Sequence, residues 1–202
     1  MRTDPFTDIF KFLTDAHWTT PVFWLLLIAS LIVAVLAYKG STKQRSIDQL
    51  LRWAVRLIVG CMWWQQSLWK LPPNFDGLRY WTEQMVEHAA FPIHGQLVKN
   101  IVLANFVPFA YVIYLTEVAV AASLMLGLFV RAGSVVGGLL ILNLYLGLYR
   151  SPAEWPWTYF FLILLMLQFA VGRYGRSLGI DALIVGREVP PESFLGRLMI
   201  FT

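Results

Sequence analysis

Long apolar runs separated by short polar segments dominate the pattern of this chain. A helix needs about 20 mostly apolar residues to cross a hydrocarbon core about 30 Å thick. Five runs approach that length, at 21–38, 50–71, 106–130, 134–148 and 157–171. We expect Arg131, Ala132 and Gly133 to form a tight turn between the third and fourth runs. The pattern predicts an all-α integral membrane protein with five spans.

Two further segments have an amphipathic pattern. In residues 5–17, Phe6, Ile9, Phe10 and Leu13 fall on one helical face, which predicts a short helix lying on the membrane surface. A helix docked on a partner protein is the alternative. Residues 74–105 mix aromatic and charged side chains, and we expect interfacial helices folded over the mouth of the bundle.

Glu117 is the most informative residue, because it lies in the middle of the uncharged apolar run 106–130. At about 1.5 Å per residue it is roughly 16 Å from the start of that run, near the middle of a bilayer. An ionisable side chain at this depth is costly and usually faces the interior of the bundle. Glu117 is either protonated and hydrogen-bonded to an amide, or ionised and paired with Lys70, Arg56 or an external group.

Other polar residues fall near the same depth in the runs after the first. This distribution predicts a four-helix core, with the run at 21–38 as a peripheral helix. About 20 Å of helix separates Arg56 from Lys70, so one or both must reach toward the membrane surface or be buried against a partner. We predict a ligand pocket with Glu117 as its catalytic residue, lined by Arg56, Gln65, Lys70, Tyr114, Asn143 and Gln168. The alternative is that these groups only make hydrogen bonds between helices.

Composition and charge narrow the class of protein. Of the 202 residues, 58% are hydrophobic and 14% are charged, against about 25% charged in a soluble domain. The net charge of +4 does not indicate nucleic-acid binding, because the basic residues lie beside the apolar runs as topology signals do. Ten Lys and Arg residues fall on one side of the five spans and six on the other. The C-terminus is therefore expected in the cytoplasm of a bacterium or archaeon and the N-terminus outside its cytoplasmic membrane.

Few residues suit metal or redox chemistry. The single cysteine, Cys61, precludes an intramolecular disulfide or a CxxC pair. The three histidines lie outside the predicted spans, so we expect neither a bis-histidine haem site nor a metal site. Electron transfer would therefore need a partner or a bound quinone.

Several scattered motifs resemble one family. They are RLIVGCMWWQQSLWKL at 56–71, the E-x9-G-x3-R pattern of Glu117, Gly127 and Arg131, WPWTYFF at 155–161, and GRYGRSLGIDALI at 172–184. Over about residues 50–185 the chain resembles the DoxX/DoxD superfamily, and the last two motifs resemble its DoxD branch. The resemblance implies a four-span bundle with both ends cytoplasmic. It divides the chain into an N-terminal addition (1–49), the bundle (50–185) and a cytoplasmic tail (186–202).

The resemblance also implies a function. DoxD is similar to the small subunit of thiosulfate:quinone oxidoreductase, which implies a membrane subunit of a quinone-linked oxidoreductase in contact with other subunits and with lipid. The charged positions that match the family are Glu117, Arg56, Lys70 and Arg131. The alternative is a non-catalytic accessory subunit of a larger respiratory or photosynthetic complex, with 1–49 and the tail as docking elements.

Overall fold

The computed structural model describes residues 4–15, 17–186 and 202, and this part of the chain forms helices and turns without a strand. Of the predicted tail, residues 187–201 lie outside the described residues. The α-helices are α1 (Pro5–Thr14), α2 (Thr20–Gly40), α3 (Ile47–Ser67), α4 (Asp76–Glu87), α5 (Pro92–Leu97), α6 (Phe106–Leu126), α7 (Val130–Gly147), α8 (Pro156–Gly172) and α9 (Ile180–Val185). Shorter helical segments are η1 (Thr42–Gln44), η2 (Leu68–Lys70), η3 (Val98–Leu103, a π-helix) and η4 (Tyr174–Arg176).

Each predicted run corresponds to a helix, and the all-helical prediction is confirmed. Among the described residues, α2, α6 and α7 are long and apolar enough to cross a membrane, and α8 is a shorter apolar helix. α3 has comparable length but carries Asp48, Arg52 and Arg56. These features indicate a membrane protein.

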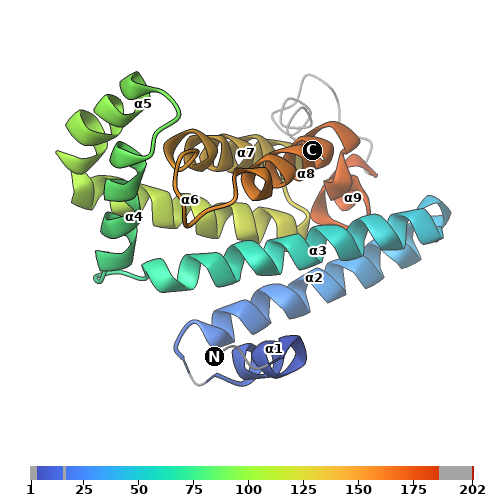
Figure 1. The fold of residues 1–202 in the computed structure, drawn as a ribbon. Coiled ribbons are helices and arrows are strands. Elements are labelled where there is room, and N and C mark those ends of the chain that lie inside the picture. The colour runs from blue at the N-terminus through green and yellow to red at the C-terminus, as the bar shows by residue number, and fades with distance from the viewer. Residues whose placement is uncertain (1–3, 16, 187–201) are drawn as a thin grey trace.

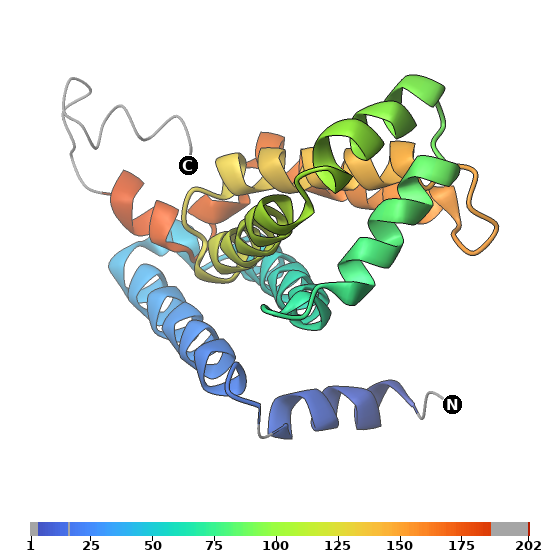
Figure 2. The same cartoon turned by 90° about the vertical axis from the view of Figure 1, so that its left-hand side faces the viewer.

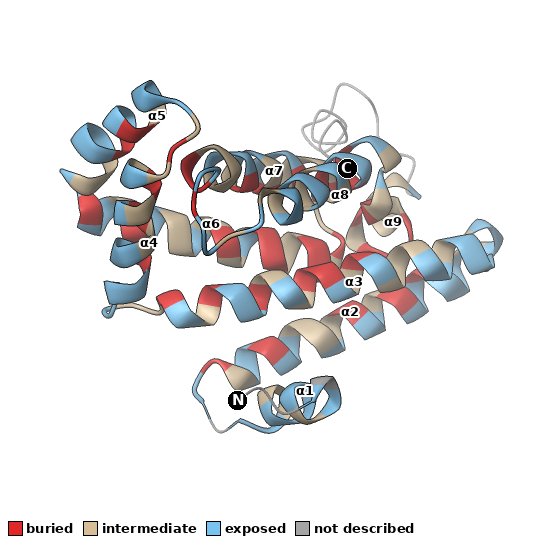
Figure 3. Ribbon diagram, viewed as in Figure 1, coloured by how far each residue is buried: buried red, intermediate tan, exposed pale blue. Residues whose placement is uncertain are grey.

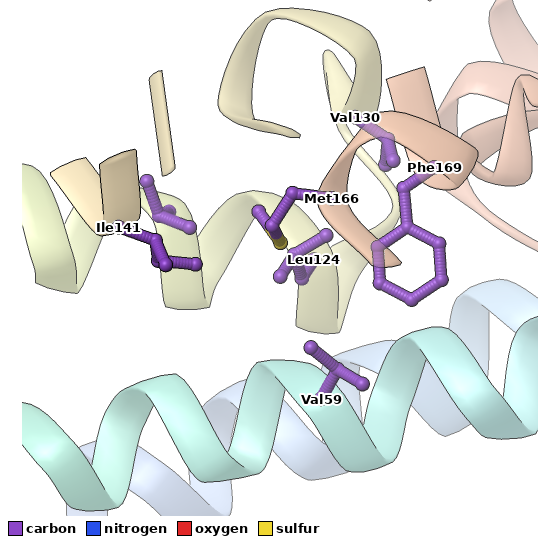
Figure 4. Packing of buried hydrophobic residues seen from close by; sticks show 7 residues of the cluster. Val59, Leu124, Val130, Ile141, Met166 and Phe169 are labelled. Atoms are coloured by element: carbon purple, nitrogen blue, oxygen red, sulfur yellow. The ribbon is translucent and has the colours of Figure 1, made fainter. Parts of the chain in front are cut away.

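The main core lies between α3, α6, α7 and α8. Figure 4 shows Val59 of α3, Leu124 of α6, Val130 and Ile141 of α7, and Met166 and Phe169 of α8 converging on one apolar cluster. Burial of such side chains contributes about 1.5–3 kcal/mol each in water, whereas in a bilayer close packing replaces that driving force.

α2 and α1 lie outside this core. One side of α2 packs through small residues, with Ser30, Ala34 and Ala37 buried, while much of its remaining surface is exposed (Figure 3). α1 runs across the end of α2 (Figure 2), where Phe12 stacks edge-on against Phe23. Hydrogen bonds from Thr7 cap α1 at Asp4 and hold the pKa of that exposed carboxyl below its ordinary value.

The segment between α3 and α6 forms the helices expected for it. α4 and α5 stand across one end of the bundle, and α9 lies at the other (Figure 1). Leu78 and Met85 on one side of α4 are buried, while Arg79 and Glu83 on the other side form an exposed ion pair with an N···O distance of 3.2 Å. This amphipathic division keeps α4 fixed over the end of the bundle.

The predicted turn at residues 131–133 is wrong. The turn lies earlier, where Gly127 and Phe129 both adopt left-handed backbone conformations with φ of 69° and 50°. α7 therefore begins at Val130, and Arg131 lies in its first turn. A side chain on Gly127 would place its Cβ 2.6 Å from the Cα of Gly179, so this position requires glycine.

Candidate functional site

A cavity of about 530 Å³ lies within the bundle beneath α4. Its wall is mostly apolar and consists of Val59, Met62, Trp63, Gln65, Gln66, Trp69 and Lys70 from α3 and η2, Leu78, Trp81, Thr82 and Met85 from α4, Ile113 and Glu117 from α6, Leu140, Ile141, Asn143, Leu144 and Leu148 from the α7 region, and Glu154, Tyr159, Leu162 and Leu165 from the α8 region. Met62, Gln65, Gln66 and Asn143 are also exposed and mark the opening. The size and lining are those of a small-molecule site.

A buried ion pair lies in the wall of this cavity. Lys70 Nζ donates a hydrogen bond to Glu117 Oε1, and each residue is only 5% exposed. The Lys70 ammonium also lies 4.5 Å from the centroid of the Trp69 ring, within cation–π distance. Of the partners expected for Glu117, the structure therefore shows Lys70.

Within the described part of the chain, one oxygen of this pair has no hydrogen-bond partner. Among the described residues, no group hydrogen-bonds to the buried Glu117 Oε2. A buried acceptor without a partner costs about 1–3 kcal/mol. The cavity wall thus contains a charged group with unused hydrogen-bonding capacity.

The structure brings together four of the seven predicted site residues, since Gln65, Lys70, Glu117 and Asn143 all line the cavity. The other three lie elsewhere. Gln168 is exposed and donates a hydrogen bond to the hydroxyl of Tyr174 at 3.2 Å, and Tyr114 packs on a separate apolar cluster around Phe75.

Arg56 is the third, and it is fully buried at 0% exposure. Its guanidinium donates to the carbonyl oxygens of Leu124 and Met125 at the C-terminal end of α6, and to that of Ser177 at 3.5 Å. A cation suits this position because the partial charge at a helix C-terminus is negative. Of the two alternatives for Arg56, the structure shows burial, against the backbone carbonyls of α6, and its predicted place in the ligand pocket is wrong.

Asp181 occupies the complementary position at the start of α7. Its two carboxylate oxygens accept hydrogen bonds from the amides of Phe129 and Val130 at 2.8 and 3.2 Å. Its own amide donates to the carbonyl of Gly127 at 2.8 Å. Burial raises the pKa of Asp181, while the amide hydrogen bonds and nearby arginines act in the opposite direction. Asp181 and Arg56 together hold the α6–α7 turn from two distant parts of the chain.

The predicted site omitted a hydrogen-bonded pair of polar residues in the cavity wall. Tyr159 Oη donates a hydrogen bond to Glu154 Oε2 at 3.0 Å, and both side chains line the cavity. Glu154 belongs to the loop before α8, so helical depth gave no signal for it. The one sequence signal for this pair was the five-residue spacing of Glu154 and Tyr159 across the start of a helix, which allows the two side chains to meet.

The fold and the site together define a class: a helical protein with helices of membrane-spanning length and an internal, mostly apolar cavity that contains a buried ion pair. No protein-family model, no curated protein and no solved structure matches this chain. The function therefore has to be argued from the cavity itself.

Proposed function

We propose that this protein is a membrane subunit of a quinone-linked oxidoreductase and that the cavity binds the quinone. The observation that carries the proposal is the buried Lys70–Glu117 pair in the wall of a mostly apolar cavity of about 530 Å³. A quinone head group is planar and apolar with oxygen atoms at two ends. Aromatic side chains such as Trp63 and Trp81 suit the ring, and Lys70 suits an oxygen atom.

The position of the opening supports a ligand dissolved in the membrane. Met62 is 54% exposed, lines the cavity and lies in the C-terminal third of α3. If α3 crosses the bilayer with α2, α6, α7 and α8, this part of α3 faces lipid. A hydrophobic ligand then reaches the cavity sideways without crossing water.

The resemblance to the DoxX/DoxD superfamily supports the same proposal. In that architecture α3, α6, α7 and α8 would be the four spans, and α2 would be the additional span. The electron donor would be thiosulfate or another reductant bound by a partner subunit. Two electrons and two protons convert a quinone to its quinol, and Glu117 is a group in the wall that can exchange a proton.

Filling the cavity tests the proposal. Leu162→Trp places a larger ring in the wall, and we expect it to weaken quinone binding at least about tenfold by steric exclusion, a change of roughly 1.4 kcal/mol. Isothermal titration of the detergent-purified protein with a short-chain benzoquinone measures the affinity.

Leu164→Trp is the matched control, because Leu164 is on the same helix but is 45% exposed, outside the cavity wall. This variant should bind the quinone like the wild-type protein. Equal binding by both variants and the wild type would place the quinone elsewhere and remove the support for a cavity site.

One observation favours the accessory-subunit alternative. Phe6, Ile9 and Phe10 of α1 are 83%, 56% and 67% exposed and project from the side of the molecule, which suits docking on another subunit. Extraction from native membranes in a mild detergent, followed by mass spectrometry of co-migrating proteins, separates the two functions. The accessory function predicts co-migration with a large complex that is lost when residues 1–40 are deleted; the oxidoreductase function predicts at most a small partner, with quinone retained.

A further inference from the structure

The cavity has a second carboxyl group besides Glu117, and it comes from a different helix pair. Glu117 belongs to α6, which packs against α3, whereas Glu154 belongs to the loop before α8 and Tyr159 to the first turn of α8, which packs against α7. The hydroxyl of Tyr159 fixes Glu154 by donating to its Oε2 at 3.0 Å. A ligand in the cavity therefore meets carboxyl groups on two sides.

Both carboxyl groups are able to accept further hydrogen bonds. Lys70 occupies only Oε1 of Glu117, and the buried Oε2 has no partner among the described residues. A carboxylate offers about four acceptor positions, of which Tyr159 uses one on Glu154. A ligand with hydrogen-bond donors therefore suits both carboxyl groups.

We propose that the cavity binds its ligand between Glu117 and Glu154 and prefers a ligand with two hydroxyl groups to the same ring with two carbonyl groups. This inference rests on the proposed function and specifies it, because the dihydroxy form of a quinone is the quinol. A quinol donates one hydrogen bond to each carboxylate. A quinone has only acceptors, so it leaves the remaining acceptor positions of both carboxylates unused and places its oxygens near theirs.

The preference has a consequence for electron transfer. Reduction adds two electrons and two protons to the quinone, forming two O–H bonds, so tighter binding of the product favours the reaction in the site. Each tenfold preference for the quinol raises the two-electron potential of the bound quinone by about 30 mV. The bound quinone is then a stronger oxidant toward the reductant of the partner subunit than a quinone free in lipid.

Calorimetric titration of the purified protein with a short-chain benzoquinone and, without oxygen, with the corresponding benzoquinol tests this inference. Hydrogen bonds to charged groups are strong, so we expect the wild-type protein to bind the quinol roughly tenfold or more tightly than the quinone. Glu154→Gln replaces one acceptor oxygen with a donor. It should reduce the quinol-to-quinone preference about tenfold, while retained quinone binding shows that the variant is folded.

Glu83→Gln is the control for the loss of charge, because Glu83 lies on the exposed side of α4 in an ion pair with Arg79. It should keep the wild-type preference. Equal affinities for quinone and quinol in the wild type, or an unchanged preference in Glu154→Gln, would overturn the inference and leave the quinone site standing. Failure of the wild type to bind either form would overturn both the inference and the proposed function.

Discussion

Lys70→Met is expected to destabilise the protein by about 3–5 kcal/mol, because it leaves the Glu117 carboxylate buried without its cation. Both residues are 5% exposed and Lys70 is the only cation that hydrogen-bonds to Glu117 in the described part of the chain. For a chain of this length the loss corresponds to a melting temperature lower by roughly 10 °C. Thermal unfolding of the detergent-purified protein, followed by tryptophan fluorescence, measures the change.

Two further variants show whether the pair is responsible. The double variant Lys70→Met with Glu117→Leu removes both charges and should recover most of the lost stability, since apolar replacement of a whole buried pair is often neutral or stabilising. Lys99→Met removes a charge from an exposed position and should change little. A double variant as unstable as Lys70→Met alone would contradict the assignment of the destabilisation to an unpaired charge.

Asp181→Ala is expected to cost about 3 kcal/mol or more, because it leaves the buried amides at the start of α7 without acceptors and removes the carboxylate near Arg56. The expected result is a lower melting temperature together with faster proteolysis at the α6–α7 turn. Limited proteolysis with mass mapping identifies the cleavage site. The Asn variant keeps one acceptor oxygen and should lose less stability than the Ala variant.

Asp48→Ala is the control variant for Asp181→Ala, because it also removes a carboxylate. Asp48 forms an exposed i, i+4 ion pair with Arg52 at 2.9 Å, and such pairs contribute about 0.3–0.5 kcal/mol. Its removal should leave the melting temperature and the proteolytic pattern nearly unchanged. A loss at Asp181 no larger than that at Asp48 would show that the amides of Phe129 and Val130 find water instead.

The apolar runs were sufficient to predict the long helices, because each run must satisfy its backbone hydrogen bonds internally. They were insufficient to place the turn between α6 and α7. Arg131 resembled the polar end of a span, but it lies inside α7, and its Nε reaches the carbonyl of Ala170 at 3.1 Å. The true turn depends on Gly127 and Asp181, which are far apart in the chain. A hydropathy pattern contains no information about a contact between such distant residues.

The candidate site was predictable only in part, as the fold was. Depth along a helix identified Glu117, Gln65 and Asn143, since residues at one level of a bundle tend to share an interior. Depth gave no direction around the helix axis, and therefore did not distinguish Gln168, which lies outside the cavity wall, from Asn143, which lines it. Arg56 and Lys70 looked alike as charges within one run, yet one binds the end of a helix and the other pairs with Glu117.

The contacts of Arg56 and Asp181 with the α6–α7 turn also have a fixed order during synthesis of the chain. Arg56 is synthesised before α6, so it can donate to the carbonyls of Leu124 and Met125 as soon as that helix forms. The amides of Phe129 and Val130, by contrast, have no Asp181 to donate to until about 50 further residues have been synthesised. The first residues of α7 therefore obtain these acceptors only after α8 and the start of α9 have been synthesised.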